Sequence, residues 1–94
     1  MSAVLKLTDV VSQAPEHLAT EVDGRFILMS IEQGAYCGLD DIGSDIWRRL
    51  VRPLTIAQIC ETMAAEYRGD RSRITADVLK LLGALREQRL VKIG

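Results

Sequence analysis

One histidine and two cysteines are the side chains of this sequence best suited to metal binding or nucleophilic catalysis. His17 has no second histidine or cysteine at ligand spacing, which argues against a metal site. Cys37 and His17 could form a thiol–imidazole pair, but no third residue is evident that would orient the imidazole. The sequence also lacks a glycine-rich phosphate loop and a pair of catalytic carboxylates. We therefore expect no metal, no cofactor and no enzymatic activity.

The aspartates at positions 40, 41 and 45 are explained by the helix that should follow them. A carboxylate at a helix start accepts unpaired backbone N–H groups and complements the positive end of the helix dipole. Apolar residues then recur on one helical face, at Ile42, Ile46, Trp47 and Leu50. Gly43, inside this helix, predicts close contact with another backbone segment. The helix should begin after Asp40 or Asp41 and stop at Arg52-Pro53.

Two more helices are expected in the second half of the chain. Thr55 and Gln58 fit a capping box, and helical spacing continues from there until Gly69. The next helix should start after Asp70 or Ser72, and residues 90–93 form a short extended tail. The apolar stripe of this last helix consists of Ile74, Val78, Leu81, Leu82 and Leu85.

Three strands should precede the helices. Asp23-Gly24 between residues 18–22 and 25–31 is a strong hairpin signal, because a type I′ turn needs positive φ at both positions. The third strand, Ala35 to Leu39, follows a turn that ends in Gly34. Residues 1–17 have no clear period, so we expect an N-terminal arm that is ordered only if it docks on a domain of residues 18–94. The predicted fold is α+β and winged-helix-like, a three-stranded antiparallel sheet followed by three helices (βββααα).

The composition disfavours several classes of partner. No run of about 18 apolar residues is present, and a basic segment followed by an apolar run is missing at the N-terminus. Two thiols without a signal peptide indicate reduced core cysteines, so we expect a cytoplasmic protein that does not contact a membrane. The net charge of −1 argues against nonspecific nucleic-acid binding.

The charge is nevertheless divided unevenly along the chain. Residues 1–45 carry two basic and eight acidic side chains, a net of −6, and residues 46–94 carry ten basic and five acidic ones, a net of +5. The split fits two alternatives: attraction between halves of one fold, or a face that meets a charged partner.

The third expected strand is the most informative element. No strand follows Ala35 to Leu39 before the helices, so it should form the edge of the sheet, and it contains neither the charge nor the proline that usually blocks an edge. The N-terminal arm or a second copy could cover it. Otherwise it can accept an extended peptide by strand addition. A proline at Cys37 should then abolish binding without unfolding the domain, because it removes one edge donor.

DNA binding by the third helix is the competing hypothesis. Its exposed side offers basic residues, but acidic ones accompany them and no stripe of Arg or Lys with Asn or Gln is obvious. The residues concerned are Arg71, Arg73, Lys80 and Arg86, with Asp77 and Glu87.

The order and spacing of several short motifs resemble a known family. The motifs are Asp23-Gly24, Leu28, Gly34-x-Tyr36-x-x-Leu39-Asp40-x-x-Gly43-x-x-Ile46-Trp47, Thr55-x-x-Gln58-Ile59 and Asp77-Val78-x-x-x-Leu82-x-x-Leu85. Over about residues 18–93 the chain resembles PqqD-like proteins, the precursor-peptide recognition elements of ribosomally made, modified peptides. Quinone-pathway members typically show Pro-Glu-Gly where this chain has Glu32-Gln33-Gly34. The sequence is more similar to the small stand-alone proteins of lasso-peptide gene clusters.

The resemblance implies a non-catalytic peptide chaperone. In that family the leader segment of a precursor peptide adds as an antiparallel strand to the third strand, in the cleft against the third helix. It is then delivered to a separate leader-cleaving cysteine protease, and a macrolactam cyclase closes the ring. The alternatives are a winged-helix DNA-binding regulator and an accessory subunit of a radical modifying enzyme.

Residue by residue, the resemblance implies three roles for the candidate site. The residues that would pair with the leader through their backbone are Ala35, Tyr36, Cys37, Gly38 and Leu39, followed by Asp40. The residues that would line apolar pockets for leader side chains are Tyr36, Ile74, Val78 and Leu81. A charge preference could come from Arg71, Arg73 and Asp77.

Overall fold

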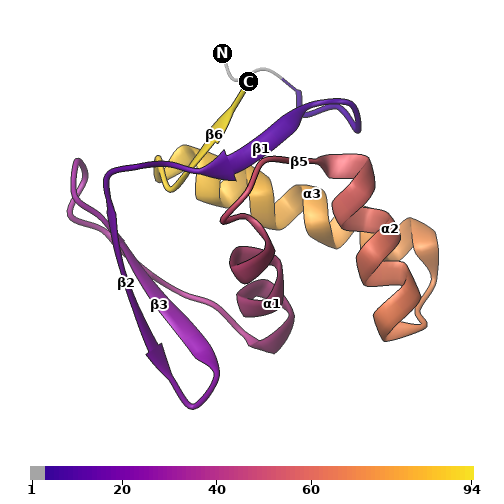
Figure 1. Cartoon of the computed structure of the whole chain (residues 1–94), viewed down its shortest axis with the longest axis horizontal. Helices are drawn as coiled ribbons and strands as arrows, with labels where there is room; N and C mark the ends of the chain where they lie inside the picture. The colour runs from indigo at the N-terminus through magenta and orange to yellow at the C-terminus, as the bar shows by residue number, and fades with distance from the viewer. Residues whose placement is uncertain (1–3) are drawn as a thin grey trace.

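The computed structural model describes residues 4–94 as two small antiparallel sheets and three helices (Figure 1). The strands are β1 (Val10–Gln13), β2 (His17–Val22), β3 (Arg25–Ser30), β4 (Tyr36–Gly38), β5 (Leu54–Thr55) and β6 (Val91–Ile93). The helices are α1 (Asp41–Arg49), α2 (Ile56–Tyr67) and α3 (Arg71–Glu87). The predicted α+β class is confirmed, and β1, β5 and β6 add a second sheet to the expected βββααα order.

The first sheet has the strand order β2-β3-β4 and is built as the sequence predicts. Asp23 and Gly24 both have positive φ, 53° and 82°, as a type I′ hairpin requires. Leu28, in the central strand, pairs with Ala19 on one side and Cys37 on the other, and its side chain is fully buried. β4 is therefore an edge strand, as expected.

The second sheet, of order β5-β1-β6, incorporates the N-terminal segment that the sequence predicts to be an irregular arm. Val11 is fully buried and pairs with Leu54 on one side and Ile93 on the other. The described part of the arm thus docks as a central strand instead of covering β4. His17, the last residue of the predicted arm, is the first residue of β2.

Local capping signals position the helices. Asp40 Oδ1 accepts the N–H of Gly43 at 2.7 Å, which decides between the two predicted caps of α1. The capping box of α2 is confirmed, with Thr55 and Gln58 exchanging bonds of 3.1 and 2.8 Å. Asp70 caps α3 by accepting the N–H of Ser72 at 2.9 Å. No helix among residues 4–94 is long and apolar enough to cross a bilayer.

The core lies between the helices and the inner faces of both sheets. Its largest buried side chains include Leu28, Ile46, Trp47, Ile59, Met63, Leu82 and Leu85. Burial of each such side chain stabilises the fold by about 1.5–3 kcal/mol before conformational entropy is counted. The sequence predicts that Ile42 shares the apolar face of α1 with Ile46 and Trp47. This prediction is wrong, because Ile42 lies at the surface. Gly43 approaches the side chains of Asp40 and Leu39, not another backbone segment as predicted.

Three ion pairs join the acidic first half of the chain to the basic second half. They are Arg48–Glu21 at 2.9 Å, Arg49–Asp45 at 3.1 Å and Arg89–Glu32 at 3.2 Å. These contacts favour the interpretation that the uneven charge reflects attraction between the two halves of one fold. Each pair is solvent-accessible and contributes about 0–1 kcal/mol.

Candidate functional site

The backbone of β4 leaves two residues with unpaired polar groups. Leu39 N–H donates to Phe26 O at 2.8 Å, and Ser30 N–H donates to Ala35 O at 3.2 Å. Hydrogen-bonded and non-bonded pairs alternate along an antiparallel ladder, so Ala35, Cys37 and Leu39 direct their N–H and C=O groups at β3. The groups of Tyr36 and Gly38 point away from β3, and no other residue of the 4–94 segment bonds to them.

This register corrects the proposed use of Cys37 as a probe of the edge. Its N–H faces Leu28, not the open side of the sheet. A proline at Cys37 would break the β3–β4 ladder, so the prediction that it spares the fold is wrong. The outward donors are Tyr36 and Gly38. The sequence predicts that successive N–H groups of β4 point alternately toward β3 and away from it. Only the observed pairing shows which of them point away.

A pocket of about 210 Å³ opens just beyond the end of β4. It lies between α1, α2 and α3, and most of its lining is apolar. Five predicted site residues line it: Asp40, Ile74, Asp77, Val78 and Leu81. The other five residues of the lining were not predicted to belong to the site: Ile42, Gly43, Ile46, Met63 and Tyr67.

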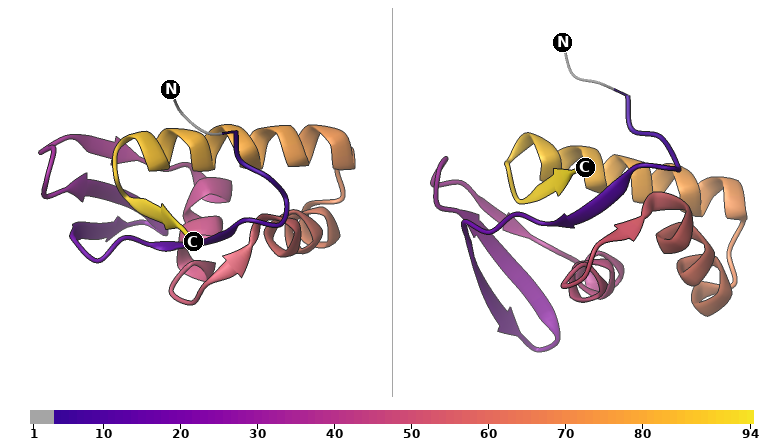
Figure 2. Two further views of the ribbon diagram at one scale, coloured as in Figure 1. Left: turned by 90° about the horizontal axis from the view of Figure 1, so that it is seen from above. Right: turned by 45° about the horizontal axis from the view of Figure 1, so that its top comes forward.

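Contacts at both ends of β4 place α3 alongside it. Before β4, Gln33 Nε2 donates to Glu87 O at the end of α3, at 3.4 Å. After β4, Asp40 shares the pocket with Asp77, nearly three turns earlier in α3. The helix therefore runs antiparallel to β4, and Figure 2 shows the β2–β4 sheet beside the C-terminal half of α3. A second hollow near Gln33 is lined by Lys80, which the sequence suggested only for DNA binding, and by Gly83 and Ala84, which it did not suggest as site residues.

The structure does not bring every predicted residue to the pocket. Tyr36 is 73% exposed and pairs with Met29, on the face opposite the buried Leu28. Arg71 lies against α2, where it forms an ion pair of 3.0 Å with Glu61. Arg73 is exposed and does not line the pocket. The ionisable groups in the pocket lining are thus Asp40, Asp77 and Tyr67, without either arginine.

A polar cluster supports the wall of the pocket. Tyr67 donates its hydroxyl to Asp45 at 2.9 Å, and Arg49 bonds both Asp45 at 3.1 Å and Glu66 at 2.8 Å. Burial raises the pKa of Asp45, but the hydrogen bonds from Tyr67 and Arg49 outweigh this effect and lower it overall. The same bond raises the pKa of Tyr67. Tyr67 is therefore held as a neutral donor that anchors α2 to α1.

Cys37 is a free cysteine on β4 and is only partly accessible. Burial raises the pKa of its thiol, which disfavours the nucleophilic thiolate. His17 bonds Ala14 O through Nδ1 at 2.6 Å, and its ring packs edge-on against Trp47. The structure thus gives the histidine local structural contacts and does not pair it with Cys37.

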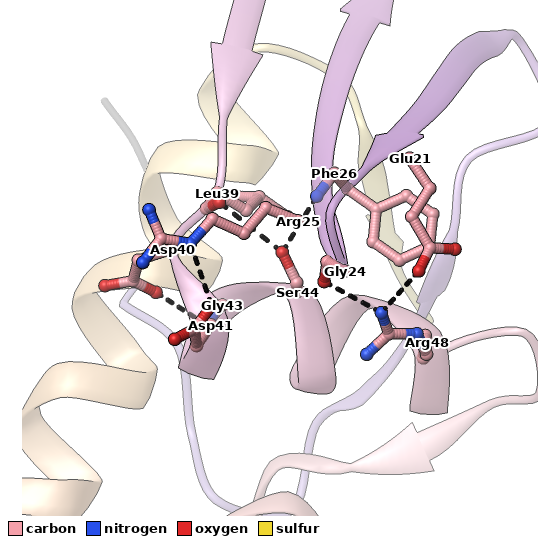
Figure 3. A network of polar contacts seen from close by, with 10 residues as sticks. All are labelled: Glu21, Gly24, Arg25, Phe26, Leu39, Asp40, Asp41, Gly43, Ser44 and Arg48. Carbon is pink, nitrogen blue, oxygen red and sulfur yellow. Dashed lines mark hydrogen bonds and ion pairs between the residues drawn. The ribbon is translucent and has the colours of Figure 1, made fainter.

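Ser44 joins the edge strand to α1 (Figure 3). Its fully buried hydroxyl accepts the N–H of Phe26 at 2.9 Å and lies 3.4 Å from Leu39 O, to which it donates. The hydroxyl stands between Phe26 N–H and Leu39 O, in place of the second ladder bond of this pair, while Leu39 N–H keeps its bond to Phe26 O. The end of β4 is therefore coupled to the helix that walls the pocket.

Replacing this hydroxyl should destabilise the domain. In Ser44→Ala the N–H of Phe26 loses its acceptor, which should cost about 1–3 kcal/mol. Urea unfolding followed by circular dichroism measures the change, with Ser72→Ala, at an exposed position of α3, as the control. Equal unfolding midpoints for the two variants would contradict the coupling.

Comparison with known proteins places this geometry in a family. Residues 25–91 match the profile described as Coenzyme PQQ synthesis protein D (PqqD). The chain belongs to the PqqD family. Two relatives are PqqA binding proteins, from Xanthomonas campestris pv. campestris (strain 8004) and Xanthomonas euvesicatoria pv. vesicatoria (strain 85-10), 38% and 36% identical over 55 residues. Each match covers 58% of this chain and 60% of the relative, so the likeness spans well under the full length of the curated PqqD relatives.

Solved structures share the PqqD-type fold. TbiB1 in complex with the TbiA(beta) leader peptide superposes with a TM-score of 0.78 at 28% identity, over 86% of this chain and 94% of TbiB1. The PqqD portion of Methylobacterium extorquens PqqCD, a stand-alone recognition element, gives 0.75 at 21% identity, over 94% of both chains. Lasso peptide synthetase B1 with its leader peptide gives 0.74 at 23%, over 87% and 96%. The resemblance to PqqD-like recognition elements is confirmed.

Proposed function

We propose that this chain is a non-catalytic recognition element that binds the leader segment of a ribosomally synthesised precursor peptide. The observation that carries the proposal is the open side of β4, where Tyr36 and Gly38 offer unpaired backbone groups next to an apolar pocket. A strand edge of this kind is a template for an added strand, and a neighbouring pocket selects the side chains that strand carries.

In the proposed complex the leader runs antiparallel to β4. Tyr36 and Gly38 exchange backbone hydrogen bonds with two leader residues that are two positions apart. Leader side chains alternate between the two faces of the sheet, so every second one points to the inner side, toward α3. An apolar leader side chain on that side enters the pocket lined by Ile74, Val78 and Leu81.

The relatives support this assignment through what they bind. Two of them are PqqA binding proteins, and TbiB1 was solved with a leader peptide. We extend this to a cytoplasmic protein that delivers its bound leader to a leader-cleaving cysteine protease, with a macrolactam cyclase acting on the same precursor. The PqqD profile match also supports the alternative of an accessory subunit for a radical modifying enzyme. A DNA-binding role for α3 has less support, because Arg71 is engaged by Glu61.

Titration of the purified protein with the leader of the precursor encoded in its gene cluster tests the proposal. We expect a dissociation constant in the micromolar range or lower, about −8 kcal/mol or more favourable. A scrambled leader of the same composition is the control. No binding of the native leader at several hundred micromolar (about −5 kcal/mol or weaker) would refute the function. Co-purification of the complex with protease, cyclase or radical-enzyme candidates then distinguishes the partner enzymes.

A further inference from the structure

The rim of the pocket carries two carboxylates that form no ion pair with the residues between 4 and 94. Asp77 lines the pocket and is exposed, and its carboxylate forms no hydrogen bond or ion pair with any residue between 4 and 94. Arg73 precedes it by one helical turn, but no ion pair joins the two side chains. Asp77 therefore presents a solvated carboxylate beside an apolar opening.

Asp40 adds a second carboxylate to the same rim. One of its oxygens caps α1 through Gly43, and the other has no partner among the residues described. Arg25 is a candidate counter-ion, because its charge interacts with that of Asp40, but its guanidinium bonds Asp41 at 2.8 Å. The pKa of Arg25 is raised chiefly by Asp41 and only to a lesser degree by the charge of Asp40.

Arg49, near the wall of the pocket, is also engaged. Its guanidinium bonds Asp45 and Glu66 and forms no ion pair with Asp40 or Asp77. An incoming peptide thus meets an apolar pocket bordered by two aspartates, and no ion pair with the residues between 4 and 94 holds either carboxylate.

We propose that Asp77, with Asp40, selects leaders that carry a Lys or Arg two residues from the apolar side chain that fills the pocket. Residues i and i+2 of a strand lie on one face about 6–7 Å apart, which places the cation at the rim when the apolar side chain is in the pocket. This inference rests on the proposed function and specifies its substrate. Of the three charge-setting candidates, only Asp77 lines the pocket, so the preference is for positive charge.

A peptide-display selection tests the preference with random sequences in place of a chosen precursor. The full chain is immobilised and challenged with an mRNA-displayed library of random 15-residue peptides. Enriched sequences should share an apolar residue with Lys or Arg at a spacing of two. Enriched peptides with no excess of basic residues at that spacing would overturn the inference and leave the peptide-binding function intact. Failure of the protein to enrich any peptide would overturn both.

A charge-reversal cycle on one enriched peptide gives the second test. Asp77→Asn should weaken its binding about threefold to tenfold, and Asp77→Lys should weaken it further. Replacing the basic residue of the peptide with Glu should restore binding to Asp77→Lys but not to the unmodified protein. Glu61→Gln, which removes an exposed carboxylate outside this pocket, is the matched control and should bind normally. Equal affinities for Asp77→Lys and the unmodified protein would overturn the assignment.

Discussion

Gly38→Pro is expected to abolish leader binding while the domain stays folded. Proline removes the outward N–H of Gly38, and its ring occupies the side of β4 where the leader would pair. Loss of this bond leaves a leader carbonyl unpaired, which together with the steric clash should weaken binding by at least about 30-fold. Titration with the leader measures the loss, and circular dichroism and urea unfolding report whether the fold is kept.

Two neighbouring variants separate the edge from the interior of the ladder. Gly38→Ala retains the N–H, and its added Cβ meets no atom within 4 Å, so this variant should bind like the unmodified protein. Cys37→Pro removes a donor that faces Leu28 and should destabilise the domain by about 1–3 kcal/mol. If Gly38→Pro binds the leader as well as Gly38→Ala does, strand addition at β4 is wrong.

Trp47→Ala should destabilise the domain by about 3–5 kcal/mol, more than Ser44→Ala or Cys37→Pro. Trp47 is 2% exposed, and the centroid of the His17 ring lies 5.0 Å from that of the indole. Its backbone carbonyl accepts the side-chain amide of Gln13 at 2.9 Å, so α1 is tied to both β1 and β2 at this position. A domain of this size has a total stability of only about 5–15 kcal/mol, so much of it would be lost.

Urea unfolding measures this effect, and the matched aromatic control is Tyr36→Ala. Tyr36 is exposed on the edge strand, so its truncation should change stability by no more than about 0.5 kcal/mol. A comparable loss in both variants would mean that burial of the indole does not hold the corner between β1, β2 and α1.

Several parts of the site could be predicted from the sequence because they depend on local interactions. The Asp23-Gly24 turn and the capping pair of Thr55 and Gln58 act within four residues of chain, where residue type restricts backbone geometry directly. The edge position of β4 followed from the absence of a strand between it and α1. The groove residues of α3 followed from helical spacing and from the family resemblance.

The remaining features depend on segments far apart in the chain. Val11 looks like part of a loose arm in the sequence, because its strand partners, Leu54 and Ile93, come from distant segments. The sequence by itself determined the hairpin turn, the capping box of α2, the three helices and the edge position of β4. Only the tertiary structure decided that Gly38 rather than Cys37 faces that edge, and that Asp77 rather than Arg71 borders the pocket. The physical reason is that strand register and helix packing set these directions, and both are fixed by contacts between elements, not within them.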